Sequence, residues 1–281
     1  MGRITTRWPV TKVAVGQEPR RRPDVLAVEE PLEIRISGRP YTVTMRTPGN
    51  DIELAAGFLV SEGIMTRAEH LDSGIHCGGP TGGDGENTYN TLNLTLGVDV
   101  EPPDPARARD FYTTSACGVC GTTSIEEVES TSSFDVSVDH STVEAALLTE
   151  LPDRLRSGQR AFDTTGGLHA AALFDAASGD LLVLREDVGR HNAVDKVVGW
   201  AVNNDRLPLR GTVLQVSGRA SFELVQKAVM AGIPILAAVS APSSLAAQLA
   251  ERSGLTLIGF LRGESMNIYT RPDRVRVTAD R

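Results

Sequence analysis

Two cysteines three positions apart carry the most distinctive chemistry of this chain. Cys117 and Cys120 lie in the segment Thr113-Thr114-Ser115-Ala116-Cys117-Gly118-Val119-Cys120-Gly121, and the only other cysteine is Cys77. Two thiols at this spacing can form a redox disulfide, supply half of a zinc site, or present a reactive thiolate for sulfur chemistry. The spacing alone leaves these three chemistries open.

Neither zinc nor a thioredoxin-type disulfide suits the surroundings of the pair well. A zinc site needs four ligands, and His76 and Cys77 could complete one, but they are adjacent and cannot easily both bind. A thioredoxin-type disulfide would open a helix directly after a strand in a βαβ pattern. A helix is predicted at 122–129, but a proline-rich break precedes the pair. Inert packing thiols are a third alternative, although the adjacent glycines offer little side chain to bury them.

Small polar residues follow three predicted strands in the second half of the chain. The segments are Ser217-Gly218-Arg219-Ala220-Ser221, Ser240-Ala241-Pro242-Ser243-Ser244 and Phe260-Leu261-Arg262-Gly263-Glu264-Ser265. Ligands of parallel α/β sheets bind beyond the carboxyl ends of the strands, and helix N-termini suit phosphate. Each segment alone is typical of a turn with a helix cap. Together they indicate an anionic ligand, although no Walker motif or G-x-G-x-x-G is present.

A fourth polar segment runs from Arg185 to Asn192 and continues to Asp195 and Lys196. It is unusually dense in charge for a strand-to-helix turn. One interpretation is a solvated capping segment with ion pairs, and the other is a functional cluster that includes His191. The sequence leaves both open.

Predicted strands and helices alternate regularly in the second half of the chain, and these elements must position the groups described above. A capping box at Ser141–Glu144 predicts a helix that ends near Gly158. Apolar runs then predict strands, and amphipathic runs between them predict helices; strands followed by crossover helices indicate parallel neighbours in an α/β layer structure. The predicted strands are 168–174, 181–184, 212–216, 234–239 and 255–260, and the predicted helices are 191–203, 222–231 and 243–252.

The first half is predicted to be α+β. Basic residues gather in residues 1–22, which we expect to be a flexible, poorly ordered arm. β-like runs at 25–29, 32–36 and 41–46 include a hairpin, Asn50 can cap a helix through Glu62, and residues 90–96 alternate like a strand. The proline-rich break at 101–105 is the expected boundary, which gives domains 23–105 and 106–281.

The overall composition excludes several classes of protein. The 281 residues are 41% hydrophobic and 23% charged, as in soluble globular proteins. A net charge of −8 disfavours a nucleic-acid binder, because phosphate neutralisation needs clustered basic residues. No apolar run is long enough for a membrane span, and none follows the basic start as in a secretory signal. Three cysteines without a signal point to the reducing cytoplasm.

Several motifs together resemble the FdhD/NarQ family of formate dehydrogenase accessory proteins. The resemblance covers roughly residues 24–275, in the expected order, and excludes the basic arm. Its motifs are Thr113–Gly121, Thr165-Gly166-Gly167-Leu168-His169-Ala170-Ala171, Glu186–Lys196, Ser217-Gly218-Arg219, Ala231-Gly232-Ile233-Pro234, Ser240-Ala241-Pro242 and Gly259–Thr270.

The resemblance implies a fold and a function. The fold would be a cytidine deaminase-like three-layer α/β sandwich with a smaller N-terminal α+β part. The function would be that of a sulfur carrier that takes persulfide sulfur from a cysteine desulfurase. It would pass this sulfur to the molybdenum or tungsten cofactor with two pterin guanine dinucleotides, before the cofactor enters formate dehydrogenase. A homodimer is also implied, and deaminase activity is not, because Ala171 stands where the catalytic Glu should be.

The resemblance also assigns roles to residues. Cys117 would carry the persulfide, and Cys120 could assist, accept the sulfur or resolve it as a disulfide. The cofactor would contact Phe260, Leu261, Arg262, Gly263, Glu264 and Ser265, and we add Ser217, Gly218 and Arg219. No metal of its own is expected. A cofactor-binding chaperone without sulfur transfer and a zinc protein are the alternative functions.

Overall fold

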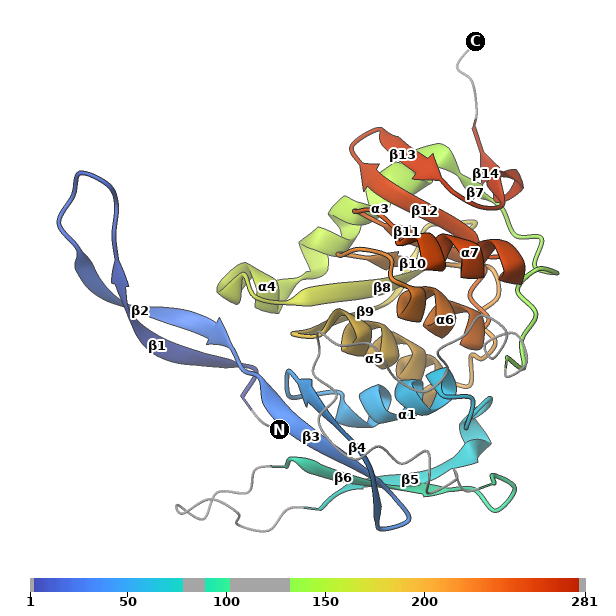
Figure 1. The fold of residues 1–281 in the computed structure, drawn as a ribbon, viewed down its shortest axis with the longest axis horizontal. Coiled ribbons are helices and arrows are strands. Elements are labelled where there is room, and N and C mark those ends of the chain that lie inside the picture. The colour runs from blue at the N-terminus through green and yellow to red at the C-terminus, as the bar shows by residue number, and fades with distance from the viewer. Residues whose placement is uncertain (1–2, 78–88, 102–131, 278–281) are drawn as a thin grey trace.

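The computed structural model of this chain describes residues 3–77, 89–101 and 132–277. Cys117, Cys120 and the predicted helix 122–129 lie outside the described residues. The described chain forms successive layers: helix α3 (Ala145–Gly158), a large sheet, helices α5, α6 and α7, then helix α1 (Asp51–Ser61), and finally a second sheet (Figure 1). The layered α/β architecture expected from the sequence is confirmed.

The large sheet positions the candidate site. Within the described residues it has six strands in the order β13-β12-β11-β10-β8-β9. The neighbours β10, β11 and β12 are parallel, as their alternation with helices predicted, whereas β8, β9 and β13 run antiparallel to their neighbours. The strands are β8 (His169–Asp175), β9 (Leu181–Asp187), β10 (Thr212–Val216), β11 (Ile235–Ala238), β12 (Thr256–Arg262) and β13 (Ser265–Ile268).

Helices cover both faces of this sheet because its strands are apolar on both sides. On one face, Ala172 and Phe174 of β8 pack with Leu148 and Leu151 of α3. The opposite face packs against the three helices that follow strands β9, β10 and β11. These are α5 (Arg190–Asn203), α6 (Phe222–Met230) and α7 (Ser244–Ser253).

The smaller sheet packs on α1 and shares a core with the rest of the molecule. Its order is β4-β3-β6-β5. One hydrophobic cluster contains Leu32 and Leu92 of this sheet together with Val194 of α5 and Leu214 of β10. The two predicted domains, 23–105 and 106–281, are therefore joined by a continuous core. The strands are β3 (Glu30–Ile36), β4 (Arg39–Arg46), β5 (Leu71–His76) and β6 (Thr91–Leu96).

Helices α1 and α5 approach each other through two glycines. A Cβ atom on Gly57 would lie 1.9 Å from the carbonyl oxygen of Asp195, and one on Gly199 would lie 1.8 Å from that of Glu53. Both distances are far inside van der Waals contact, so no side chain can stand at either position without moving a helix. The two glycines thus allow α1, in the first half of the chain, to pack closely against α5, which contains the end of the polar segment 185–196.

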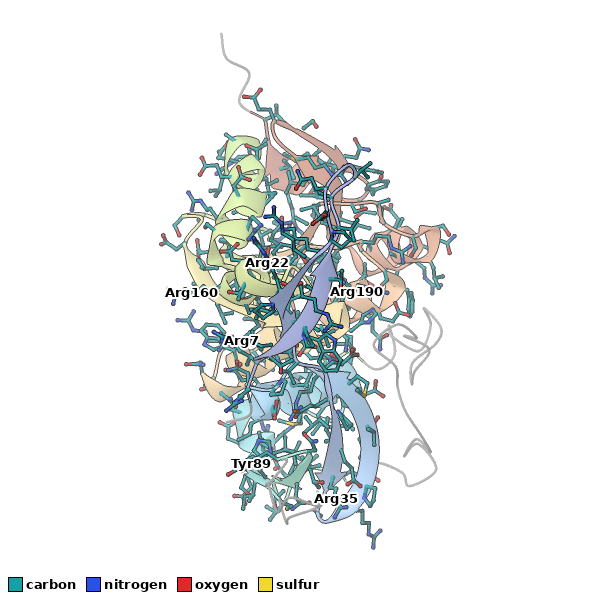
Figure 2. All side chains as sticks on the ribbon, turned by 90° about the vertical axis from the view of Figure 1, so that its left-hand side faces the viewer. Arg7, Arg22, Arg35, Tyr89, Arg160 and Arg190 are labelled. Carbon is teal, nitrogen blue, oxygen red and sulfur yellow. The ribbon has the colours of Figure 1, made fainter. Side chains whose placement is uncertain are left out.

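The predicted poorly ordered arm is instead a β-hairpin. Strands β1 (Thr5–Lys12) and β2 (Arg20–Ala27) pair antiparallel over eight residues, and Gly16 takes a positive φ in the turn. The basic composition suggested disorder, but the Thr, Val and Trp residues of these segments have a high intrinsic preference for strands. The ribbon projects from the body, and Figure 2 shows Arg7 and Arg22 on it in front of Arg160 and Arg190.

Two predicted helix caps are not formed. Glu144 is the residue before α3, and residues Val143–Glu144 (β7) pair with Val275–Arg276 (β14). This pairing draws the chain away from the capping box, and the Ser141 hydroxyl bonds to Asp139. Before α1, Asn50 adopts a left-handed conformation, and its side chain forms no capping hydrogen bond. No described helix is long and apolar enough to cross a membrane.

Candidate functional site

A pocket of about 630 Å³ lies at the carboxyl ends of β10 and β11. Ser217 and Val239, which follow these strands, form part of its wall, and His169 at the start of β8 lies beside them. Arg156 of α3 and Phe162 of α4 (Arg160–Thr165) line the opposite side. Because β8 is antiparallel to β10, its first residue lies at the same sheet edge as the end of β10. The pocket is where a ligand of an α/β sheet is expected.

The start of α4 is fixed to the sheet by Glu186 of β9. Its carboxylate accepts the backbone N–H groups of Ala161 and Phe162 at 3.0 and 2.8 Å. These are N–H groups that a short helix leaves without an internal acceptor. The side of the pocket that contains Phe162 is therefore held by a carboxylate from the edge strand.

The predicted segment Ser217-Gly218-Arg219 reaches the pocket in part. Ser217 lines it, but its hydroxyl oxygen already accepts the Ala170 N–H at 2.9 Å, so this side chain joins β8 to β10. Gly218 lies against the His169 ring, while Arg219 is exposed. Of the three, only Ser217 lines the pocket.

The predicted segment Phe260–Ser265 lies next to the pocket through one contact. Arg262 donates its Nε–H to the carbonyl of Val239 at 2.7 Å, and Val239 lines the pocket. Phe260 is 41% exposed with φ of 53°, and Gly263 also has a positive φ, so the backbone turns sharply around Arg262. Leu261 is fully buried in the core below α3, and therefore its side chain cannot contact a ligand without unfolding.

Two basic side chains, His169 and Arg190, lie against Gly218, and the sequence analysis named neither of them individually as a site residue. Burial lowers the pKa of His169, and the nearby charges of Arg190 and His191 lower it further. The Nε of Arg190 is buried and has no hydrogen-bond partner among the described groups. Residues 169, 190 and 218 are distant in the chain, so the sheet topology was needed to bring them together.

His191 is occupied by a contact of its own. Its Nε2 lies 3.2 Å from the Ser221 hydroxyl and 3.7 Å from the Glu223 carboxylate. The close approach of His191 is the main cause that lowers the pKa of Glu223 to about 2. His191 thus ties α5 to the start of α6 and stands beside the pocket as a positioning group.

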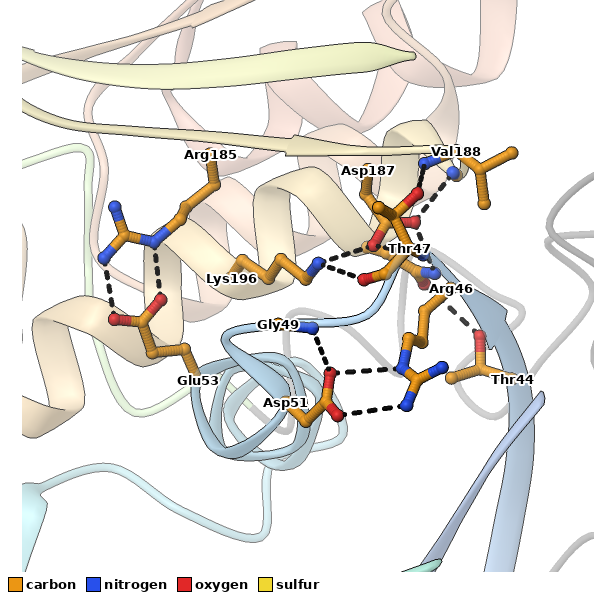
Figure 3. A network of polar contacts seen from close by, with 12 residues as sticks. Thr44, Arg46, Thr47, Gly49, Asp51, Glu53, Arg185, Asp187, Val188 and Lys196 are labelled. Carbon is orange, nitrogen blue, oxygen red and sulfur yellow. Dashed lines mark hydrogen bonds and ion pairs between the residues drawn. The ribbon is translucent and has the colours of Figure 1, made fainter. Parts of the chain in front are cut away.

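Most of the polar segment 185–196 is a buried network that joins the two halves of the molecule (Figure 3). Lys196 lies 2.7 Å from the Asp187 carboxylate and donates to the Thr47 carbonyl at 2.9 Å. Asp187 also accepts the backbone N–H groups of Thr47 and Gly189. Arg185 binds Glu53 through two hydrogen bonds of 2.6 and 2.7 Å. The ion-pair interpretation holds for these residues, but the pairs are internal rather than solvated.

The remaining cysteine and its neighbour form no metal centre with the described residues. Cys77 is an exposed free thiol, and His76 lies 3.6 Å from the Asp51 carboxylate. Over residues 3–77, 89–101 and 132–277, no three His, Cys, Asp or Glu side chains gather as metal ligands would. Any role of Cys117 and Cys120 in such a site lies outside the described residues.

Comparisons with known proteins agree with one another. The model of the FdhD/NarQ family matches residues 27–276. The chain is 61% identical over 272 residues to a sulfur carrier protein FdhD from Mycolicibacterium paratuberculosis, covering 97% of this chain and 99% of that protein. It is 58% identical to the sulfur carrier protein FdhD of Mycobacterium tuberculosis, covering 98% and 100%.

A solved structure shares the fold. The crystal structure of a candidate formate dehydrogenase accessory protein from Desulfotalea psychrophila superposes with a TM-score of 0.75, at 24% identity, over 98% of this chain and all of that chain. Its similarity extends beyond the residues that the family model matches, because that model begins at residue 27.

Proposed function

Because the chain belongs to the FdhD/NarQ family, we propose that it is a sulfur carrier in the maturation of formate dehydrogenase. In finer terms, Cys117 accepts persulfide sulfur from a cysteine desulfurase. The sulfur then passes to the molybdenum cofactor with two guanine dinucleotides, before that cofactor enters formate dehydrogenase. The names of the relatives support the first statement, and the chemistry of the two neighbouring thiols supports the second.

The proposed binding of the cofactor rests on a single observation, the pocket at the carboxyl ends of β10 and β11. It is hollow enough for part of a nucleotide, at about 630 Å³, and Arg262 is tied to its rim. Guanine dinucleotides are anionic, and pockets at this edge of α/β sheets accept phosphate-containing ligands. The acceptor would be held here by Arg262, the backbone of Gly218 and the neighbouring helix ends.

In the proposed sulfur chemistry, Cys117 carries the persulfide, and Cys120 could assist, accept the sulfur or resolve the persulfide as a disulfide. The Cys117 thiolate attacks the outer sulfur of the donor persulfide, and the donor cysteine leaves as a thiolate. If the Cys120 thiolate then attacks the inner sulfur of the Cys117 persulfide, a Cys117–Cys120 disulfide forms and the outer sulfur leaves as sulfide with the bonding electron pair. A thiol reductant must afterwards restore both thiols.

Loading the protein with a desulfurase and cysteine tests the carrier role. Mass spectrometry should place the added sulfur on Cys117, and Cys117→Ala should abolish loading and formate dehydrogenase activation. Cys77→Ala is the matched control, since Cys77 is an exposed free thiol. Loading and activation that survive Cys117→Ala would show that the assigned carrier is wrong.

A cofactor-binding chaperone without sulfur transfer is the second candidate, because the pocket at the strand ends could hold a cofactor without any transfer of sulfur. It predicts that Cys117→Ala and Cys120→Ala keep cofactor delivery, whereas Arg262→Ala loses it. We also propose a homodimer, which light scattering of the purified protein checks directly.

A further inference from the structure

We propose that the β1–β2 ribbon is an arm that docks onto the body of a second copy of this chain. The body here means the chain after the ribbon, from residue 28 onward. The inference deepens the proposed homodimer and rests on it, because it names the surface through which two copies bind. The sulfur-carrier role does not depend on it.

One face of the ribbon carries exposed apolar side chains. The register of the ladder and the alternation of side chains put Trp8 and Leu26 on the same face, where they are 59% and 38% exposed. The other face lies toward the body at its base, since a Cβ built on Gly167 would lie 3.9 Å from the Ala27 Cβ. The described residues expose 14 large apolar side chains, and five of them lie on this one hairpin: Ile4, Trp8, Val13, Val15 and Leu26. Such a concentration is typical of a surface that binds another macromolecule.

The basic side chains of the ribbon are those of a protein interface. Five of its six basic residues are arginine and one is lysine. Arg and Trp are enriched at the energetic centres of protein interfaces, whereas Lys is depleted there. A hollow of about 360 Å³ combines both types, and its walls are Arg7, Trp8, Pro9, Arg21, Arg22 and Pro23. This combination fits a protein surface that offers apolar groups beside carboxylates.

The docking surface is a face of the ribbon rather than one of its edges. Pro9 is paired directly with Pro23 in the ladder. Because proline has no N–H, this pair must occupy a position where the backbone N–H groups would point outward to the ribbon edges. Both edges are therefore interrupted, which disfavours the addition of a strand from another chain.

Charge complementarity selects a second copy of this chain as the partner. Residues 3–27 hold six of the 28 Lys and Arg but only two of the 36 Asp and Glu. The rest of the chain therefore has 22 basic and 34 acidic side chains, a formal net charge of −12. The basic ribbon projects away from its own acidic body, so it is placed to meet the acidic body of another copy (Figure 1). In a symmetric pair both ribbons make this contact.

Light scattering of the full chain over a series of concentrations tests the arm. Arg20→Glu with Arg22→Glu reverses two charges on the Trp8 face, and Trp8→Ala removes the apolar anchor. Each change should weaken dimerisation at least about thirtyfold, the loss typical of an interface hot spot. Arg20→Lys with Arg22→Lys should retain part of the affinity, because the charge is kept. Arg206→Glu with Arg210→Glu is the matched control, since it makes the same charge change at exposed sites between α5 and β10, and it should not weaken dimerisation.

Two further readouts do not depend on a loss of affinity. A photo-crosslinking residue at position 8, in a mixture of ordinary and isotope-labelled protein, should join the ribbon of one copy to the body of the other. The amides of β1 and β2 should exchange with solvent more slowly in concentrated, dimeric protein than in dilute, monomeric protein, with those of β10 to β12 unchanged. Thermal melting of each variant checks that its body is folded.

The outcomes separate the arm from the proposed homodimer and from the carrier role. A wild-type dimer that the ribbon variants leave intact overturns the arm but keeps the homodimer. A wild-type protein that is monomeric at every concentration overturns both, while sulfur loading of Cys117 still tests the carrier role by itself. Crosslinks confined to a single copy overturn the arm. Ribbon-dependent binding of tRNA or of anionic lipid vesicles by a monomeric protein would overturn the second copy as the partner.

Discussion

Lys196 and Asp187 form the most deeply buried ion pair of the described network, with side chains 2% and 0% exposed. Removing one partner of such a pair leaves the other charge buried without compensation. We expect Lys196→Met to lower the free energy of unfolding by about 3 to 5 kcal/mol. Chemical denaturation measures the loss. Arg154→Met should cost less than about 1 kcal/mol, since its pair with Glu150 is on the surface, and equal losses would contradict the prediction.

The Glu223 carboxylate makes the free energy of unfolding depend on pH in the acidic range. His191 holds its folded pKa at about 2, below the ordinary 4.5, so the stabilisation is complete above pH 4.5 and is lost as the pH falls toward 2. Glu223→Gln should remove this part of the acid sensitivity, on the order of 1 to 2 kcal/mol, since partial exposure screens the contact. Denaturation curves at pH 7 and pH 3 measure it. An identical pH 3 loss in wild type and Glu223→Gln would refute this, and Glu251→Gln serves as the exposed control.

Single residues also show which parts of the candidate site could be predicted from the sequence. The small polar strand ends were found because they directly follow apolar runs, and the pocket does lie at that edge. Leu261 was included because it stands inside a motif, but strand alternation directs its side chain into the core. Arg190 was named only within the segment Arg185–Asn192, and His169 only within a motif of the family resemblance. Their approach to Gly218 could not be predicted, because it depends on the antiparallel placement of β8 beside β10.

At the scale of elements, the contact between α1 and α5 depends on two glycines. Gly57→Ala would place a Cβ atom 1.9 Å from the Asp195 carbonyl oxygen, so the helices must separate. Overpacking of this kind typically lowers the free energy of unfolding by about 1 to 3 kcal/mol. We expect a loss near the upper end of this range, because the added Cβ would meet backbone atoms. A thermal unfolding scan of Gly57→Ala and Gly167→Ala tests it. At Gly167 the nearest atoms are 3.9 Å away, and a similar loss in both variants would contradict the packing.

Most helices and strands of the second half were predictable from the sequence, whereas the hairpin was not. Apolar runs such as 212–216 and 234–239 are typical of strands buried on both faces, and β10 and β11 lie there. The β1–β2 ribbon buries few side chains, so its sequence shows no hydrophobic period. Its pairing depends on cross-strand backbone bonds, which composition does not reveal.

At the scale of the whole molecule, the ribbon and the body should differ in local stability. Trp8 on the ribbon is 59% exposed, and two-stranded ribbons are marginal without a third layer. Hydrogen exchange followed by mass spectrometry should show the amides of β1 and β2 opening at much lower free energy than those of β10 to β12. Equal protection of the ribbon and the six-stranded sheet would contradict this and indicate that something covers the ribbon.

The glycine contact between α1 and α5 also limits how the sequence can change over evolution. A Cβ at Gly57 or Gly199 would meet backbone atoms of the other helix rather than a side chain. A smaller residue on the facing helix therefore cannot relieve the clash, so no second substitution compensates the first. Both positions should remain glycine in relatives that keep this packing, even where the surrounding helix residues have diverged.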